Sequence, residues 1–196
     1  MPSMTIDKAK FLVIDFEMTG LDPETDEIVE VAAIPVTGFN IGIDPGFYSE
    51  IEPKRSVPAS TKAVHGLRGR ELAGAPNAQE VLPELVQMFN NRIVVGHNIE
   101  CDLSFLRHKA MRIGIMPPKR PLVDTSNLAG AIWPGDGRIS LDELLRKFDL
   151  ERPRGHHNAL DDARLTATLF IKMTHSLKAQ GRISTVADLL KIGGLR

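Results

Sequence analysis

The sequence predicts an α/β fold in which a mixed sheet of five strands is flanked by helices. Two observations predict it. The N-terminal part contains three apolar runs separated by short turn-rich segments, as expected for antiparallel strands. From about residue 77 onward, short apolar runs alternate with longer segments of helical periodicity, which is typical of strands and helices packed together in one α/β domain.

The three N-terminal strands are expected at residues 10–16, 27–36 and 47–52. The first is the apolar run that ends at Phe16, and the turn-rich segment 20–26 follows it. Because the connection to the second strand is short, these two strands should form an antiparallel hairpin. Pro53 stops the third strand, since proline cannot donate to a strand ladder.

The remaining elements alternate along the chain. Helices are expected at 58–65, 77–89, 102–113, 140–148 and 158–179, and strands at 92–95 and 122–123. Ser140 followed by Glu143 has the pattern of a capping box. Gly181 should end the last long helix, and 185–192 should form a final short one. We therefore expect one domain at 1–180 and a short C-terminal helix or tail at 181–196.

Composition restricts the function. A chain of 196 residues with 42% hydrophobic and 25% charged residues is typical of one soluble globular domain. Its net charge of -1 argues against a broad basic field, so any polyanion must be held by a few local groups or be delivered by a partner. One cysteine, no signal-peptide core and no membrane-length apolar run predict a cytoplasmic protein that does not enter a membrane.

Four carboxylates and a histidine lie in three widely separated segments, each beside an apolar stretch. Asp15 and Glu17 close the first predicted strand, Asp102 opens a helix, and His157 and Asp162 lie at the start of the last long helix. Such groups can converge at one end of a sheet, where carboxylates repel each other unless cations hold them. Hard divalent cations prefer oxygen ligands, so the pattern predicts a two-metal phosphodiester hydrolase.

Taken singly, these signals are weak. Asp15 and Glu17 share one face of a strand but could also form a polar strand end. Asp102 alone could be a carboxylate stabilised by the helix macrodipole. The third segment offers two registers, because His156 and Asp161 are spaced in the same way as His157 and Asp162.

Together and in this order, the segments resemble the DEDDh 3′–5′ exonucleases, the group that contains the proofreading epsilon subunit of bacterial DNA polymerase III. The resemblance covers about residues 10–175, with motifs at 15–20, 97–102 and 157–163 and two further landmarks at 64–67 and 123–125. The family places alanine two residues after the histidine, which favours the register of His157 and Ala159.

The resemblance implies a ribonuclease-H-like fold, with 1–180 as the exonuclease domain. It implies that Asp15, Glu17 and Asp162 hold one Mg²⁺ or Mn²⁺, that Asp15 bridges to a second ion, and that Asp102 supports the site, with His157 as general base. It also assigns contacts with the terminal nucleotide to Met18, Thr19, Gly20 and Leu21, and further substrate contacts to His65 and Asn98.

The expected function is therefore a metal-dependent 3′–5′ exonuclease that releases nucleoside 5′-monophosphates from single-stranded or frayed DNA ends, in proofreading or repair. A DNA polymerase is a candidate partner. Two alternatives remain open. The segment 17–22 and the doubled Asp161-Asp162 are similar to oligoribonuclease, which would make RNA the substrate. A catalytically inactive nucleic-acid binding module is the alternative from another class.

Basic residues follow the second motif. The densest basic stretch outside the motifs consists of Arg107, His108, Lys109, Arg112, Lys119 and Arg120. They could line the path of the nucleic-acid strand, or they could form an ordinary solvated helix face.

Overall fold

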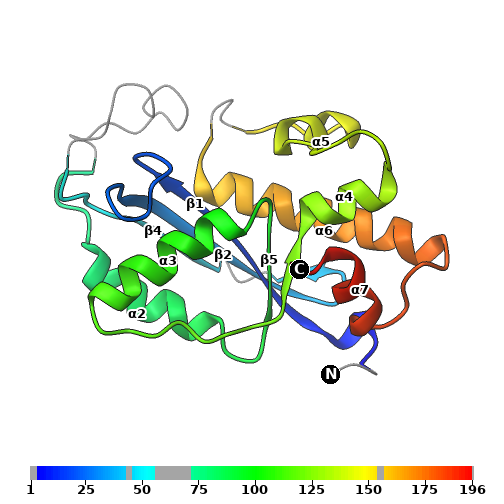
Figure 1. The fold of residues 1–196 in the computed structure, drawn as a ribbon, viewed down its shortest axis with the longest axis horizontal. Helices are drawn as coiled ribbons and strands as arrows, with labels where there is room; N and C mark the ends of the chain where they lie inside the picture. Colours follow the sequence, from blue (N-terminus) through cyan, green and yellow to red (C-terminus); the bar gives the residue numbers. More distant parts are fainter. Residues whose placement is uncertain (1–3, 43–45, 56–71, 154–156, 196) are drawn as a thin grey trace.

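The computed structural model describes residues 4–42, 46–55, 72–153 and 157–195. Within these ranges the chain forms one six-stranded mixed sheet with helices on both faces (Figure 1). The strand order is β3-β2-β1-β5-β6, and β4 also pairs with β2. The predicted mixed α/β architecture with antiparallel N-terminal strands is confirmed, with one strand more than the five expected.

The strands are β1 (Lys10–Met18), β2 (Ile28–Thr37), β3 (Asn40–Ile41), β4 (Phe47–Glu50), β5 (Ile93–Gly96) and β6 (Leu122–Asp124). β1 pairs antiparallel with β2 and parallel with β5, and β5 pairs parallel with β6. The unexpected strand, β3, has two residues and follows β2 through a tight turn in which Gly38 has a φ of 58°. A strand this short has no periodicity that a sequence could display.

The helices are α2 (Ala78–Met88), α3 (Glu100–Arg112), α4 (Thr125–Ile132), α5 (Leu141–Lys147), α6 (Ala159–Ala179) and α7 (Val186–Gly193), with a 3₁₀ turn at Ile6–Lys8. The sequence did not indicate α4, because it is short and interrupted by Gly130. The helix expected at 58–65 lies outside the described residues. Ser140 caps α5 as expected, because its side chain accepts from the Glu143 amide. The reciprocal half of the capping box is not formed in the described chain, and the Glu143 carboxylate instead lies 3.9 Å from Lys147 Nζ.

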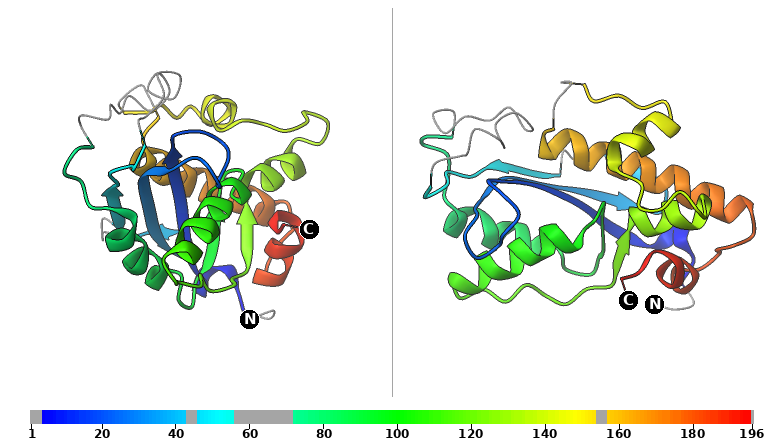
Figure 2. Two further views of the ribbon diagram at one scale, coloured as in Figure 1. Left: turned by 60° about the vertical axis from the view of Figure 1, so that its left-hand side comes forward. Right: turned by 45° about the horizontal axis from the view of Figure 1, so that its top comes forward.

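Side chains alternate between two cores on the two faces of the sheet. Phe11 and Val13 of β1 belong to a cluster with α4 to α7, whereas Leu12 and Ile14 belong to a cluster with α2 and α3. Figure 2 shows α6 and the pair α2–α3 on opposite sides of the sheet. β1 is therefore buried on both faces, as expected for a central strand.

The C-terminal residues pack on the same body. Ile183, Val186 and Leu189 are buried in the cluster that contains α6. A Cβ at Gly193 would lie 2.8 Å from side-chain atoms of Leu128 and Val123, so only glycine allows α7 to approach α4 and β6 this closely. No described helix is both long and apolar enough to span a bilayer.

Candidate active site

The first motif lies at the end of β1. Asp15 and Glu17 continue the alternation of Phe11 and Val13, so their side chains lie on the face that α6 covers. Glu17 is opposite Glu30 of β2, and the register shifts between Glu17 and Met18. Bulges of this kind often re-aim side chains next to active sites.

Asp102, in the first turn of α3, lies at the open edge of β1. The pairing of β1 with β5 reaches only to Val13 and Val95, so the backbone beyond has no strand partner on that side. Asp102 Oδ1 accepts a hydrogen bond of 2.9 Å from the amide of Phe16. The second motif is thereby fastened to the residue that separates Asp15 from Glu17.

A tight turn connects β5 to α3 and sets this position. A Cβ at Gly96 would lie 2.9 Å from Ile99, and Asn98 adopts the left-handed conformation with a φ of 54°. The carboxylate of Asp124 accepts from the amides of Asn98 at 3.0 Å and of Ile99 at 3.2 Å. The motif-like segment 123–125 therefore holds the second motif in place.

The third motif begins α6. Asn158 caps the helix by accepting from the amide of Asp161. His157 Nδ1 lies 2.9 Å from Asp162 Oδ2. Ligand atoms of Glu17, His157 and Asp162 all lie within 4.8 Å of one another, which is close enough for one cation. His156, of the competing register, lies outside the described residues, as does His65.

Glu30 is a buried carboxylate that sequence reasoning missed. It is fully buried, and it accepts hydrogen bonds of 2.5 Å from both Tyr48 Oη and Asn158 Nδ2, and one of 3.0 Å from the Ala159 amide. It thus ties β2 to the first residues of α6. A single acidic residue inside the apolar run 28–36 was the signal that could have found it.

Arg152 is a second residue that was missed. Its Nε donates to Asp162 Oδ1 at 2.6 Å, and it also donates to Asp142. Its Nη2 lies 3.4 Å from His157 Nδ1. Burial alone would lower the pKa of Arg152, but the hydrogen bonds to Asp162 and Asp142 outweigh burial and raise it. The group stays charged, so the site contains its own cation.

The electrostatics of the cluster favour further positive charge. Burial, and then repulsion from Asp102 and Glu17, raises the pKa of Asp15 well above its usual range. Burial and repulsion from Asp162 raise the pKa of Glu17 to about 8, and burial raises that of Asp102 to about 7. Carboxylates held this closely must be protonated or be compensated by cations, so the donor set fits a divalent-metal site.

The predicted nucleotide contacts differ in what they can offer. Thr19 Oγ1 donates to Asp26 Oδ1 and accepts from the Glu27 amide, so its hydroxyl is occupied by the turn. A Cβ at Gly20 would lie 2.3 Å from the Asp26 carboxylate, which explains the glycine. Leu21 is 85% exposed, so its side chain is accessible.

The fold and the carboxylate cluster together define a nuclease-type domain. A family model described as "Exonuclease" matches residues 12–170. The chain therefore belongs to this exonuclease family.

Relatives agree with this assignment. The chain is 35% identical over 173 residues to the DNA polymerase III subunit epsilon of Aquifex aeolicus, a match that covers 85% of this chain and 81% of that protein. It is also 35% identical over 188 residues to the PolC-type DNA polymerase III of Thermotoga maritima, covering 96% of this chain but 13% of the polymerase. The chain thus spans about an eighth of that relative's length.

Solved exonucleases share the fold. Exonuclease X in complex with 5′ overhanging duplex DNA superimposes with a TM-score of 0.67 at 25% identity, covering 92% of this chain and 99% of that one. E. coli exonuclease I in complex with a dT13 oligonucleotide superimposes with a TM-score of 0.76 at 16% identity, covering 89% of this chain and 43% of that one. The comparisons support the expected 3′–5′ exonuclease and do not favour the alternatives.

Proposed function

We propose that this domain removes nucleoside 5′-monophosphates from the 3′ ends of single-stranded or frayed DNA with the help of two Mg²⁺ or Mn²⁺ ions. The observation that carries the proposal is the convergence of Glu17, His157 and Asp162 within 4.8 Å, next to the buried Asp15. No single segment of the chain could form this cluster alone.

Asp15, Glu17 and Asp162 would hold the ions, and Asp102 would support them with the oxygen that does not bind Phe16. When bound, the ions would activate water and stabilise the charge that develops on the leaving oxygen. The raised pKa values of Asp15 and Glu17 support this assignment, because a nearby divalent cation would restore their ionised forms.

His157 is the proposed general base. Its Nδ1 is held by Asp162, which leaves Nε2 to accept a proton from water. The hydrogen bond with Asp162 raises the pKa of His157, because the carboxylate stabilises the imidazolium that forms when the proton arrives. Its side chain is 35% exposed, so water can reach the ring.

The preference for DNA over RNA rests on the relatives. The two relatives described above are named as a polymerase III subunit and a polymerase, and the two superimposed exonucleases were solved with DNA. A polymerase, either in the same chain or as a separate subunit, is the proposed partner. The single cysteine remains the argument for a cytoplasmic location.

One assay tests the function. Purified protein is incubated with Mg²⁺, Mn²⁺ or EDTA and with matched DNA and RNA oligonucleotides that carry a label at either end, and the products are resolved by length. We expect 5′-labelled DNA to shorten one nucleotide at a time and 3′-labelled DNA to release a labelled mononucleotide at once, only with metal. The Asp15→Asn variant controls for contaminating nucleases. Loss of the 5′ label first, or equal degradation in EDTA, would overturn the proposal.

A further inference from the structure

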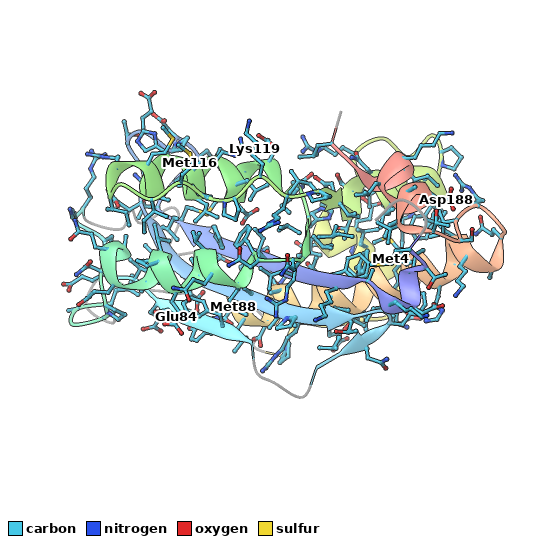
Figure 3. The ribbon with its side chains drawn as sticks, turned by 90° about the horizontal axis from the view of Figure 1, so that it is seen from below. Met4, Glu84, Met88, Met116, Lys119 and Asp188 are labelled. Atoms are coloured by element: carbon cyan, nitrogen blue, oxygen red, sulfur yellow. The ribbon has the colours of Figure 1, made fainter. Side chains whose placement is uncertain are left out.

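The basic stretch that follows Asp102 does not form one continuous surface. Lys109 of the same helix is 5% exposed, and its Nζ lies 3.7 Å from Glu27. Lys119 and Arg120 precede β6, whereas the site lies beyond the opposite end of the parallel strands, and Figure 3 shows Lys119 beside Met116 on the underside of the molecule. Lys109, Lys119 and Arg120 therefore offer no exposed charge at the site.

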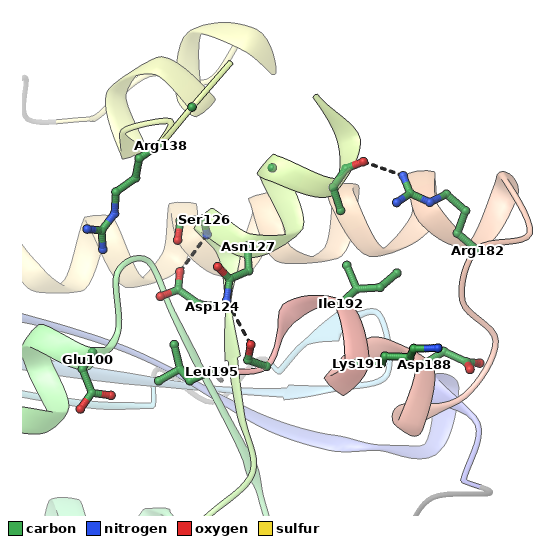
Figure 4. Close-up of a pocket in the computed structure, with 14 residues that line it drawn as sticks. Glu100, Asp124, Ser126, Asn127, Arg138, Arg182, Asp188, Lys191, Ile192 and Leu195 are labelled. Atoms are coloured by element: carbon green, nitrogen blue, oxygen red, sulfur yellow. Dashed lines mark hydrogen bonds between the residues drawn. The ribbon is translucent and has the colours of Figure 1, made fainter. Parts of the chain in front are cut away.

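An open groove of about 880 Å³ begins next to the second motif. Its walls are the start of α3, the length of α4, the residues before α5, and α7 with the C-terminal residues (Figure 4). Three basic side chains line it: Arg138, Arg182 and Lys191. All three residues are exposed.

The charges of these basic residues are not compensated. Arg138 Nε donates to Asn98 Oδ1 at 2.8 Å, and Arg182 Nη1 donates to the carbonyl of Ala131 at 2.6 Å. Both acceptors are neutral. Across residues 4–42, 46–55, 72–153 and 157–195, none of the three basic residues forms an ion pair.

The carboxylates of the groove are already engaged. Asp124 accepts from the amides of Asn98, Ile99 and Ser126. Asp188 accepts from the amides of Ser184 and Thr185 at the start of α7, and Glu100 pairs with Arg107 at 3.1 Å. The groove lining therefore holds as many carboxylates as basic side chains, but the three basic groups are exposed and form no ion pair across the described residues, so they can bind an anion.

Asn98 connects the groove to the second motif by a hydrogen bond from Arg138. This residue belongs to the turn that positions α3 and Asp102, and its side-chain oxygen accepts the hydrogen bond from Arg138. One of the three basic groups of the groove therefore lies next to the turn that precedes Asp102.

We propose that this groove binds the phosphate backbone of the single strand on the 5′ side of the nucleotide being removed. The proposal rests on the proposed exonuclease function and adds a binding site to it. Arginine and lysine bind phosphates regardless of base sequence, so the contacts should be sequence-independent and salt-dependent. The groove should matter only for substrates long enough to reach it.

The double variant Arg182→Gln with Lys191→Gln tests the groove, because neither residue touches the carboxylates. Its matched control is Arg112→Gln with Lys119→Gln, which removes the same charge from exposed residues elsewhere. Affinity for dT3 and dT12 is measured by fluorescence anisotropy with Ca²⁺ in place of the catalytic ion, over a range of salt concentrations. Hydrolysis of the p-nitrophenyl ester of thymidine 5′-monophosphate reports the chemistry without a strand.

We expect the groove variant to bind dT12 about 10-fold more weakly and to lower the salt slope by about 1.4, as two lost phosphate contacts imply. Binding of dT3 and hydrolysis of the ester should not change, and the control should behave as the wild type. Unchanged dT12 binding and an unchanged salt slope, or an equal effect of the control, would overturn the proposal. A protein partner would then be the candidate occupant of the groove.

Two further comparisons keep the result interpretable. If the double variant melts early, Lys191→Gln alone replaces it, because Lys191 makes no hydrogen bond across the described chain that its loss would break. Half the effect on the salt slope is then expected, and no effect overturns the proposal. If the wild type binds dT12 but hydrolyses neither substrate, the exonuclease function fails while the binding data still decide the groove.

Discussion

Arg152 forms a bidentate ion pair with Asp162, in which Nε lies 2.6 Å from Oδ1 and Nη2 lies 3.3 Å from Oδ2. Oδ2 is also 2.9 Å from His157 Nδ1. Both oxygens of this carboxylate therefore face groups that carry, or can carry, positive charge. Any metal ion that uses Asp162 must share it with a guanidinium or displace it.

Replacing Arg152 with glutamine should show whether the guanidinium compensates the buried Asp162 and whether it competes with the metal ion for that carboxylate. In EDTA the variant should lose about 3 kcal/mol of unfolding free energy, because Asp162 is left buried and poorly compensated. Its affinity for Mn²⁺, measured by titration calorimetry, should rise because the competing cation is gone. The Arg164→Gln variant, at an exposed position of the same helix, is the control. Weaker Mn²⁺ binding by Arg152→Gln would show that the arginine assists the metal instead.

Asp15→Asn should abolish nuclease activity without lowering the melting temperature. The buried carboxylate repels Asp102 and Glu17, so a neutral isostere removes that repulsion while it weakens metal binding. Gel-based turnover and a thermal melt in EDTA measure the two effects. A variant that keeps near-wild-type turnover would show that Asp15 is not a metal ligand.

His157→Ala should lower the rate by about 10²–10⁴-fold, the usual effect of removing a general base. His156→Ala should have a mild effect, because one histidine occupies the site. Single-turnover rates with saturating metal make the comparison. A larger loss at His156 than at His157 would mean that the third motif uses the other register.

Glu30→Gln should destabilise the protein by about 1–3 kcal/mol, because an amide replaces an acceptor that faces several donors. The start of α6 should also be displaced, so turnover should fall although Glu30 touches no substrate. Tyr48→Phe removes one of the same hydrogen bonds at the edge of the network and serves as the control. Unchanged turnover in a Glu30→Gln protein that is clearly destabilised would show that Glu30 does not position the site.

The metal-free protein should lose stability as the pH rises from 6 to 8.5. The pKa of Glu17 is raised from 4.5 to about 8 and that of Asp102 from 3.8 to about 7, so the folded state binds more protons than the unfolded state between those values. The raised pKa of His157 acts in the same direction, because its contribution is lost above the folded pKa.

Denaturant unfolding in EDTA at several pH values measures this slope. Glu17→Gln should flatten it, and added Mn²⁺ should stabilise the wild type more at pH 8.5 than at pH 6. A stability that rises with pH over this range would contradict the raised pKa values of Glu17 and Asp102.

Much of the architecture could be predicted because it is encoded in local patterns. The apolar runs of β1 and β2 and the short turn between them specify an antiparallel pair, and Asn158 and Gly181 mark the ends of α6. The convergence of the three motifs could be predicted because one lies at the end of a strand and two at the starts of helices that pack on the same sheet. Element boundaries agree within about two residues.

The residues that were missed act through contacts remote in sequence. Glu30 meets Asn158 across 128 positions, and nothing near Glu30 indicates that partner. Arg152 precedes the third motif in a proline-containing loop without periodicity, so its side-chain direction could not be inferred. The sequence left open whether the basic residues after Asp102 line a strand path, and it gave no sign that Lys109 turns inward to Glu27.

The hydrogen bond between the Phe16 amide and Asp102 has a mechanical consequence. Helices commonly slide by an ångström or more when ligands bind or domains close. Here α3 is pinned to the backbone of β1 by the same carboxylate that it contributes to the site. A sliding movement of α3 would therefore have to break this hydrogen bond, because β1 is itself held by β2 and β5. The bond thus opposes a change in the spacing between Asp102 of the helix and Asp15 of the strand.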